Sequence, residues 1–152
     1  MGKLRDKMAE DLKLRGLCDN TRETYLRCAE LFVKHHRKSP TLMGKGEVRD
    51  FLLHLVEDLK RSPSTYNVYA ASLKFLYSYT LERPEEVAWI RRMRVPHRLP
   101  AILSGEEIER LLEALGSLKM QAIVMPAYGA GLRVSEVVNL RVADIDSRRM
   151  VI

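Results

Sequence analysis

Hydrophobic and polar residues alternate with a helical period through much of the first ninety residues. One stripe of hydrophobic and half-polar side chains, spaced three and four positions apart, comprises Tyr25, Cys28, Ala29, Phe32, Val33 and His36. A second stripe comprises Val48, Phe51, Leu52, Leu55, Val56 and Leu59. Charged residues fill the other faces, so the pattern predicts two amphipathic helices. The first is expected to begin with Asn20 as its N-cap, and the second at Gly46.

Two further helices are predicted on either side of this pair. The first covers about 4–15 and ends near Gly16. The last begins with Ser62 as N-cap and Pro63 at the first helical position, where the missing N–H costs nothing, and ends near Arg83. A short helical turn follows, with Trp89. Because short connections imply antiparallel neighbours, residues 1–90 are predicted to form a four-helix domain.

Four tyrosines, Tyr66, Tyr69, Tyr77 and Tyr79, fall on the last of these helices. Such a row could form a surface for stacking nucleic-acid bases. Aromatic residues at helical spacing more often fill a core while their hydroxyls reach its edge. We therefore expect core packing.

Residues 91–103, which we call the basic strap, interrupt the helical pattern. They contain Arg91, Arg92, Arg94 and Arg98 but no acidic residue, and they include two prolines. Proline fixes its own φ and disfavours helix in the residue before it, so an extended connector is predicted. Its four arginines suit a polyanion, but a solvated linker has the same composition.

Three more helices are predicted after the strap, over about 104–115, 118–128 and 134–140. Ser104 and Glu107 form a capping-box pattern at the start of the first, and Pro126 lies inside the second. The β-branched run from Arg148 to Ile152 predicts the start of a strand. Because helix faces and a strand edge remain without partners, the core of residues 104–152 is expected to be marginal.

Composition excludes several classes of protein. The chain has 152 residues, 46% of them hydrophobic and 30% charged, which argues against disorder. It has neither a run of roughly 20 apolar residues nor a secretory signal, so we expect a cytoplasmic protein without a membrane span. Cys18 and Cys28 are ten residues apart and are expected to be reduced. No ligand spacing suggests a metal site.

Two segments after residue 97 resemble the opening of the catalytic domain of the tyrosine recombinase (phage integrase) family. They are RLPAILSGEEIERLLEAL at 98–115 and AYGAGLRVSEVVNLRVADID at 127–146. The preceding helices resemble the SAM-like core-binding domain of that family. The resemblance implies a mainly α chain with a four-helix domain at 1–90, a basic linker at 91–103, and at 104–152 the three helices and first strand of a truncated α+β catalytic domain.

The resemblance also assigns site residues. Family members cut one strand of duplex DNA with a tyrosine hydroxyl and pass through a phosphotyrosyl intermediate, without a metal or other cofactor. Arg133 matches the first catalytic arginine, whose guanidinium can donate two hydrogen bonds to the phosphate oxygens. Glu136, one helical turn later, would orient Arg133. Outside this motif, an ion pair joining two helix ends would be the preferred interpretation of Arg133.

The other catalytic residues of the family have no match in these 152 residues. The family also uses a hairpin lysine, a histidine-x-x-arginine box, a further histidine or tryptophan, and a late tyrosine. All four histidines here precede Arg133, and Tyr128, in the helix before it, matches no nucleophile position. We therefore expect this chain alone to be inactive as a recombinase. Off DNA it is expected to be a monomer, whereas the intact family assembles as an oligomer on DNA.

Two hypotheses about function remain. The chain is either the DNA-binding part of a site-specific recombinase or a non-catalytic helical DNA-binding or interaction protein that competes with a full-length relative. In both, Arg91, Arg92, Arg94 and Arg98 are expected to contact the DNA backbone. Other cations on the helices could also do so: Lys13, Arg15, Arg22, Arg27, Lys34, Arg37, Lys38, Lys60, Arg61 and Lys74.

Overall fold

The computed structural model describes residues 2–96, 99–146 and 148–149 and is mainly helical, as predicted. It divides into two compact units, Met1–His97 and Arg98–Ile152. The elements of the first unit are α1 (Gly2–Leu14), α2 (Asp19–His36), η1 (Pro40–Leu42), α3 (Lys45–Glu57), α4 (Pro63–Phe75), η2 (Leu76–Thr80) and η3 (Pro84–Glu86). Those of the second are α5 (Gly105–Ala114), α6 (Leu118–Gly129), α7 (Val134–Asn139) and η4 (Val142–Asp144).

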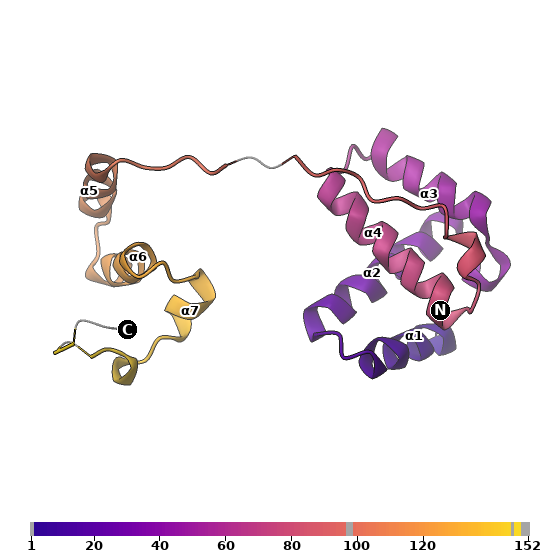
Figure 1. The fold of residues 1–152 in the computed structure, drawn as a ribbon, viewed down its shortest axis with the longest axis horizontal. Helices are drawn as coiled ribbons and strands as arrows, with labels where there is room; N and C mark the ends of the chain where they lie inside the picture. Colours follow the sequence, from indigo (N-terminus) through magenta and orange to yellow (C-terminus); the bar gives the residue numbers. More distant parts are fainter. Residues whose placement is uncertain (1, 97–98, 147, 150–152) are drawn as a thin grey trace. The chain divides into compact units, whose positions relative to one another are not determined.

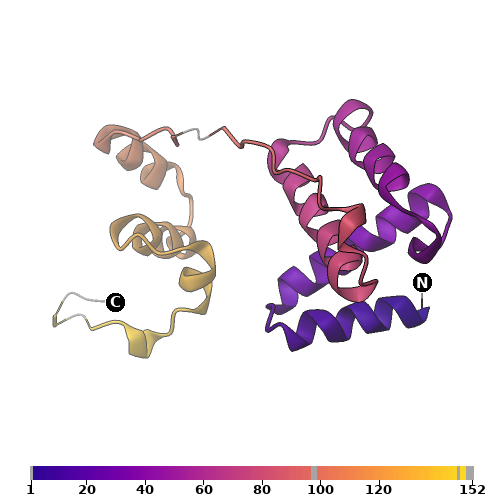
Figure 2. The same ribbon diagram turned by 45° about the vertical axis from the view of Figure 1, so that its right-hand side comes forward.

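The four predicted helices of the first unit pack into one bundle. Figure 1 and Figure 2 show α2 and α4 side by side, with α1 packed against α2 and α3 against α4. The hydrophobic stripes meet in the middle, where the rings of Phe32 and Phe51 lie edge to face with their centroids 5.3 Å apart. Tyr77 lies against Phe32 and is fully buried. The helical period therefore identified the faces that form the core.

Helix starts follow local chemistry, with one predicted cap in error. The Ser62 hydroxyl accepts a hydrogen bond from the Thr65 N–H at 3.3 Å, so α4 begins as predicted. Asn20 is not the N-cap of α2, because the extended residue is Cys18 and Asn20 already lies within the helix. The predicted stripe of α3 is also one residue too long, because the helix ends at Glu57 and Leu59 lies beyond it, 45% exposed.

The C-terminal end of α4 widens into a π-helical turn, η2. The Leu81 N–H donates to the Leu76 carbonyl at 2.9 Å, five residues back. The Lys7 ammonium on α1 donates to the Thr80 carbonyl at 2.8 Å and so joins α1 to this turn. The turn carries the buried ring of Tyr77 and the exposed ring of Tyr79.

Core packing of the tyrosines is confirmed for two of the four. Tyr66 and Tyr77 are buried, and Tyr69 packs at the edge of the core. Tyr79 is 44% exposed instead, and the Arg15 guanidinium lies 3.5 Å from the centre of its ring. The expected core role is therefore wrong for Tyr79, because the π turn directs it outward while Tyr77 points inward.

The first half of the basic strap is attached to α4. The side-chain amide of Asn67, itself 8% exposed, donates to the Met93 carbonyl at 2.9 Å and accepts from the Met93 N–H at 2.8 Å. Ile90, just before the strap, is buried. The described residues of the strap, 91–96 and 99–103, have no regular secondary structure, as predicted, but the first of them are part of the first unit.

In the second unit, the capping box at the start of α5 is confirmed. The Ser104 N–H donates to a Glu107 carboxylate oxygen at 2.8 Å, and the Glu107 N–H donates to the Ser104 hydroxyl at 3.3 Å. Among the described residues of this unit, only Ile108 and Val137 are buried hydrophobics. Most other apolar side chains of its helices are exposed or half-buried.

The predicted strand is not confirmed. Arg148 and Arg149 lie in a turn, and the rest of the predicted strand, 150–152, falls outside the described residues. No sheet is present in the part of the chain that the structure describes. A strand needs a hydrogen-bonded partner, and none of the described segments supplies one.

Candidate nucleic-acid interface

Arg133 and Glu136, the two site residues predicted for the second unit, lie in direct contact. Gly131 adopts a left-handed φ of 67° and turns the chain before α7, so that Arg133 becomes the residue preceding the helix. One Glu136 carboxylate oxygen accepts from the Arg133 backbone N–H at 2.7 Å. The other accepts from the Arg133 guanidinium at 3.1 Å. A single carboxylate thus holds both the backbone and the side chain of Arg133.

The Arg133 guanidinium remains open to solvent. Its side chain is 83% exposed, and Glu136 is its ion-pair partner among the described residues. An arginine side chain has five N–H donors and stays protonated at any physiological pH. After its contact with Glu136, it can still present donors to an anion with two oxygens, such as a phosphate.

The arginines of the basic strap have different settings. Arg91, Arg92 and Arg94 are exposed, and none of them forms an ion pair with another described residue. Arg98 lies outside the described residues. Of these described strap arginines, Arg92 alone lines one of the hollows of the surface. The two hydrogen bonds between Asn67 and Met93, which we call the Asn67 clamp, hold the adjacent backbone against α4.

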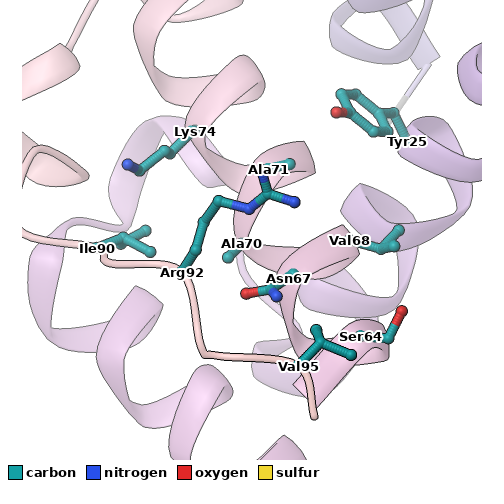
Figure 3. A pocket seen from close by; sticks show the side chains of 10 residues that line it. All are labelled: Tyr25, Ser64, Asn67, Val68, Ala70, Ala71, Lys74, Ile90, Arg92 and Val95. Atoms are coloured by element: carbon teal, nitrogen blue, oxygen red, sulfur yellow. The ribbon is translucent and has the colours of Figure 1, made fainter. Parts of the chain in front are cut away.

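A hollow of about 400 Å³ lies between the strap and α4. Figure 3 shows the Arg92 side chain extending from the strap over α4, on the side that carries Ala71 and Lys74. A neighbouring hollow shares Tyr25, Ala71 and Lys74 and adds Arg15 with Tyr79. The two hollows are therefore parts of one continuous surface.

We call this surface, with Arg15, Lys74 and Arg92, the α4 cationic surface. Among the described residues, no carboxylate lines either of its hollows. By contrast, the hollow between α1 and α2 mixes Lys13 and Arg22 with three acidic side chains. Repeated cations without nearby carboxylates create the positive potential that attracts a polyanion.

The sequence could not single out Arg15 and Lys74 from the other helix cations. They are 59 positions apart and come together only because α1 and α4 belong to the same bundle. The one available signal was the tyrosine row, since the π turn places Tyr79 beside Arg15.

A second group missed from sequence could hold a metal ion. His35 and His36 at the end of α2 approach Asp50 on α3, and their nearest ligand atoms all lie within 4.8 Å of one another. The signal was the His-His pair at a helix end. Without knowledge of which residue on the facing helix lies opposite, this pair carries little information.

None of the described helices is both long enough and apolar enough to cross a membrane.

Comparisons with known proteins all find similarity to integrases and recombinases. The sequence profile "Phage integrase, N-terminal SAM-like domain" matches residues 4–87. The protein y4qK of Sinorhizobium fredii, whose name places it among integrases and recombinases, is 40% identical over all of this chain and 50% of its own length. The tyrosine recombinase XerA of Pyrococcus furiosus is 31% identical over 93% of this chain and 48% of its own.

A solved structure shows the same fold. The crystal structure of a XerA recombinase aligns with 97% of this chain and 52% of its own, with a TM-score of 0.52 and 24% sequence identity. The chain thus spans about half the length of the curated relatives it matches.

Proposed function

Because this chain belongs to the tyrosine recombinase (phage integrase) family, we propose that it binds duplex DNA for site-specific integration or recombination. The observation that carries the proposal is the exposed Arg133 guanidinium, fixed by Glu136 within the GLRVSE segment. The proposed domains are a DNA-binding domain at 1–90, the strap at 91–103, and the N-terminal part of a catalytic domain at 104–152.

Arg133 is proposed to contact the scissile phosphate. When a tyrosine hydroxyl attacks the phosphodiester, a 3′-phosphotyrosyl bond forms while the bond to the 5′ oxygen of the cut strand breaks, and that oxygen leaves as a hydroxyl. Negative charge builds up on the nonbridging oxygens in the transition state. A guanidinium held in place beforehand stabilises that charge without reorganising during the reaction. Glu136 serves as a positioning residue, since its carboxylate already accepts from the guanidinium.

DNA cleavage also needs groups that these 152 residues lack. An arginine stabilises charge but cannot attack phosphorus, and no lysine, histidine-x-x-arginine box or tyrosine follows Arg133 at a matching position. We therefore propose that the polypeptide alone binds DNA, forms no covalent adduct with it, and is a monomer when free.

The α4 cationic surface is proposed to contact the DNA backbone, together with the exposed strap arginines. Arg15, Lys74 and Arg92 present three positive charges with no carboxylate among their neighbours in the hollows. Phosphate contacts position a protein on DNA, and each one releases counterions. Binding should therefore weaken steeply with salt.

The test is a titration of labelled duplex DNA at about 50 mM and about 200 mM salt. The triple variant R15A/K74A/R92A should bind more weakly, and the slope of log K against log salt should flatten by about 2.7, which is roughly 0.9 for each lost contact. The control K3A/K13A/K38A removes the same charge from exposed positions elsewhere and should keep most of the affinity.

Equal losses in both triple variants would show that net charge alone governs binding, and would remove the α4 cationic surface from the interface. The strap is tested separately with R91A/R92A/R94A/R98A. An unchanged affinity and salt slope in that variant would remove the strap from the interface.

A further inference from the structure

The C-terminal end of α2 and the first half of α3 bring imidazole and carboxylate groups together. His35 and His36 occupy the last turn of α2, and Asp50 lies on α3. The cluster belongs to the first unit, whereas Arg133 belongs to the second, and among the described residues it lines neither hollow of the α4 cationic surface. We propose that His35, His36 and Asp50 bind one divalent transition-metal ion of the Zn²⁺ type, which links α2 to α3.

The His35–Asp50 pair already has the spacing of two zinc ligands. Its Nε2 and Oδ2 atoms are 3.5 Å apart. Two ligands bound to Zn²⁺ at about 2.0–2.1 Å in a tetrahedral arrangement lie about 3.4 Å from each other. An ion can therefore enter between these atoms with little movement of either residue.

His36 is prepared as a ligand by its hydrogen bond. Its Nε2 lies 2.9 Å from the Glu47 carbonyl oxygen. Because a carbonyl can only accept, this contact places the proton on Nε2 and leaves the lone pair of a neutral ring on Nδ1. Metal-binding histidines commonly donate their second nitrogen to a carbonyl or carboxylate, which fixes the ring and raises its basicity.

His54 packs against the side of His35, one of the three proposed ligands. Its ring stacks on His35 with centroids 4.5 Å apart and an interplanar angle of 30°. Its own Nδ1 is held by the Asp58 carboxylate at 2.6 Å. Asp58 and His54 therefore fix a flat surface that limits rotation of His35.

The donor set selects the class of ion. Two imidazoles and one carboxylate suit Zn²⁺ and its transition-metal neighbours, whereas Mg²⁺ and Ca²⁺ prefer oxygen ligands. Three protein ligands leave a fourth position for water. The ion would also lie at the C-terminal end of α2, where the helix dipole favours positive charge.

The first test uses the full chain without a polyhistidine tag and Zn²⁺ as the probe. Calorimetric titration should show saturable binding of one ion per chain. Saturating Zn²⁺ should raise the midpoint of thermal unfolding by on the order of 5 °C, while Mg²⁺ should not. The ¹⁵N signal of His36 Nδ1 should shift on binding, which identifies the ligating atom directly.

Variants separate this site from nonspecific metal binding. H35A, D50N and H36Q should each weaken Zn²⁺ affinity by more than about 10-fold. Gln at 36 can still donate to the Glu47 carbonyl, so H36Q tests ligation with the hydrogen bond retained. E57Q removes an exposed charge from α3, the helix that carries Asp50, and should bind Zn²⁺ with the affinity of the parent chain.

Two results would overturn the proposal. One is the absence of saturable Zn²⁺ binding by the folded chain, which would leave the cluster as a polar contact between His35 and Asp50 alone. The other is unchanged Zn²⁺ affinity in the H35A/H36Q double variant, folded as judged by its unfolding curve without metal. That result would place the bound ion elsewhere.

Discussion

At the scale of single residues, the two cysteines have opposite environments. The exposed Cys18 thiol lies 3.1 Å from the Thr21 hydroxyl, and this hydrogen bond is the main reason that the pKa of Cys18 is lowered. Cys28 is buried among core side chains, and burial raises its pKa to about 11. The thiolate is the reactive form, so both accessibility and charge favour Cys18.

We predict that Ellman's reagent modifies one thiol rapidly in the folded chain at about pH 8 and the second only on unfolding, because Cys28 stays protonated and covered. Absorbance after mixing gives both rates. The C18S variant should lose the fast phase. Comparable rates for both thiols in the native chain would contradict the assigned burial of Cys28.

At the scale of elements, Asn67 is the residue that attaches the strap to α4. Its side-chain amide makes two hydrogen bonds with the backbone of Met93, donating to the carbonyl and accepting from the N–H. A buried amide that loses such partners stays removed from water without a compensating hydrogen bond, which destabilises the fold. This pair of bonds therefore sets where the strap leaves the first unit.

Replacing Asn67 by Ala should lower the free energy of unfolding of the first unit by about 1–3 kcal/mol, because two hydrogen bonds are lost. Urea unfolding followed by fluorescence of Trp89, the only tryptophan, reports on this region. S64A on the exposed side of the same helix should change stability little. Equal stability of N67A and the parent chain would show that the clamp contributes nothing.

Helices could be predicted from the sequence where the residues that define them lie close together along the chain. The stripe through Phe32 and the cap at Ser62 depend on residues a few positions apart, so the sequence contains the whole signal. Arg133 and Glu136 are likewise one turn apart. The Asn67 clamp and the His35–Asp50 pair depend on which surfaces of distant segments meet, and periodicity does not specify that.

At the scale of the whole molecule, the two units differ in how much apolar surface they enclose. The first has a continuous core built from all four helices, η2 and the turn before the strap. In the described part of the second, α5, α6 and α7 bury only Ile108 and Val137. Since burial of apolar surface is the dominant stabilising term, the second unit should open more readily.

Limited trypsin digestion of the folded chain should therefore remove the second unit first and leave a resistant core of roughly ninety residues. Lys119 and Arg141 offer early cleavage sites, and mass spectrometry identifies the boundary. Equal survival of both units during digestion would contradict the difference in core packing.

The contact between Lys7 and Thr80 has a consequence for cooperativity. These residues are 73 positions apart, and the Thr80 carbonyl, at the end of the π turn where helix carbonyls lack an intrahelical donor, accepts from the ammonium. The first helix cannot detach without breaking this contact and uncovering the turn. The N-terminal segment and the end of α4 should therefore open together in one local unfolding event, so that a substitution that destabilises one also destabilises the other.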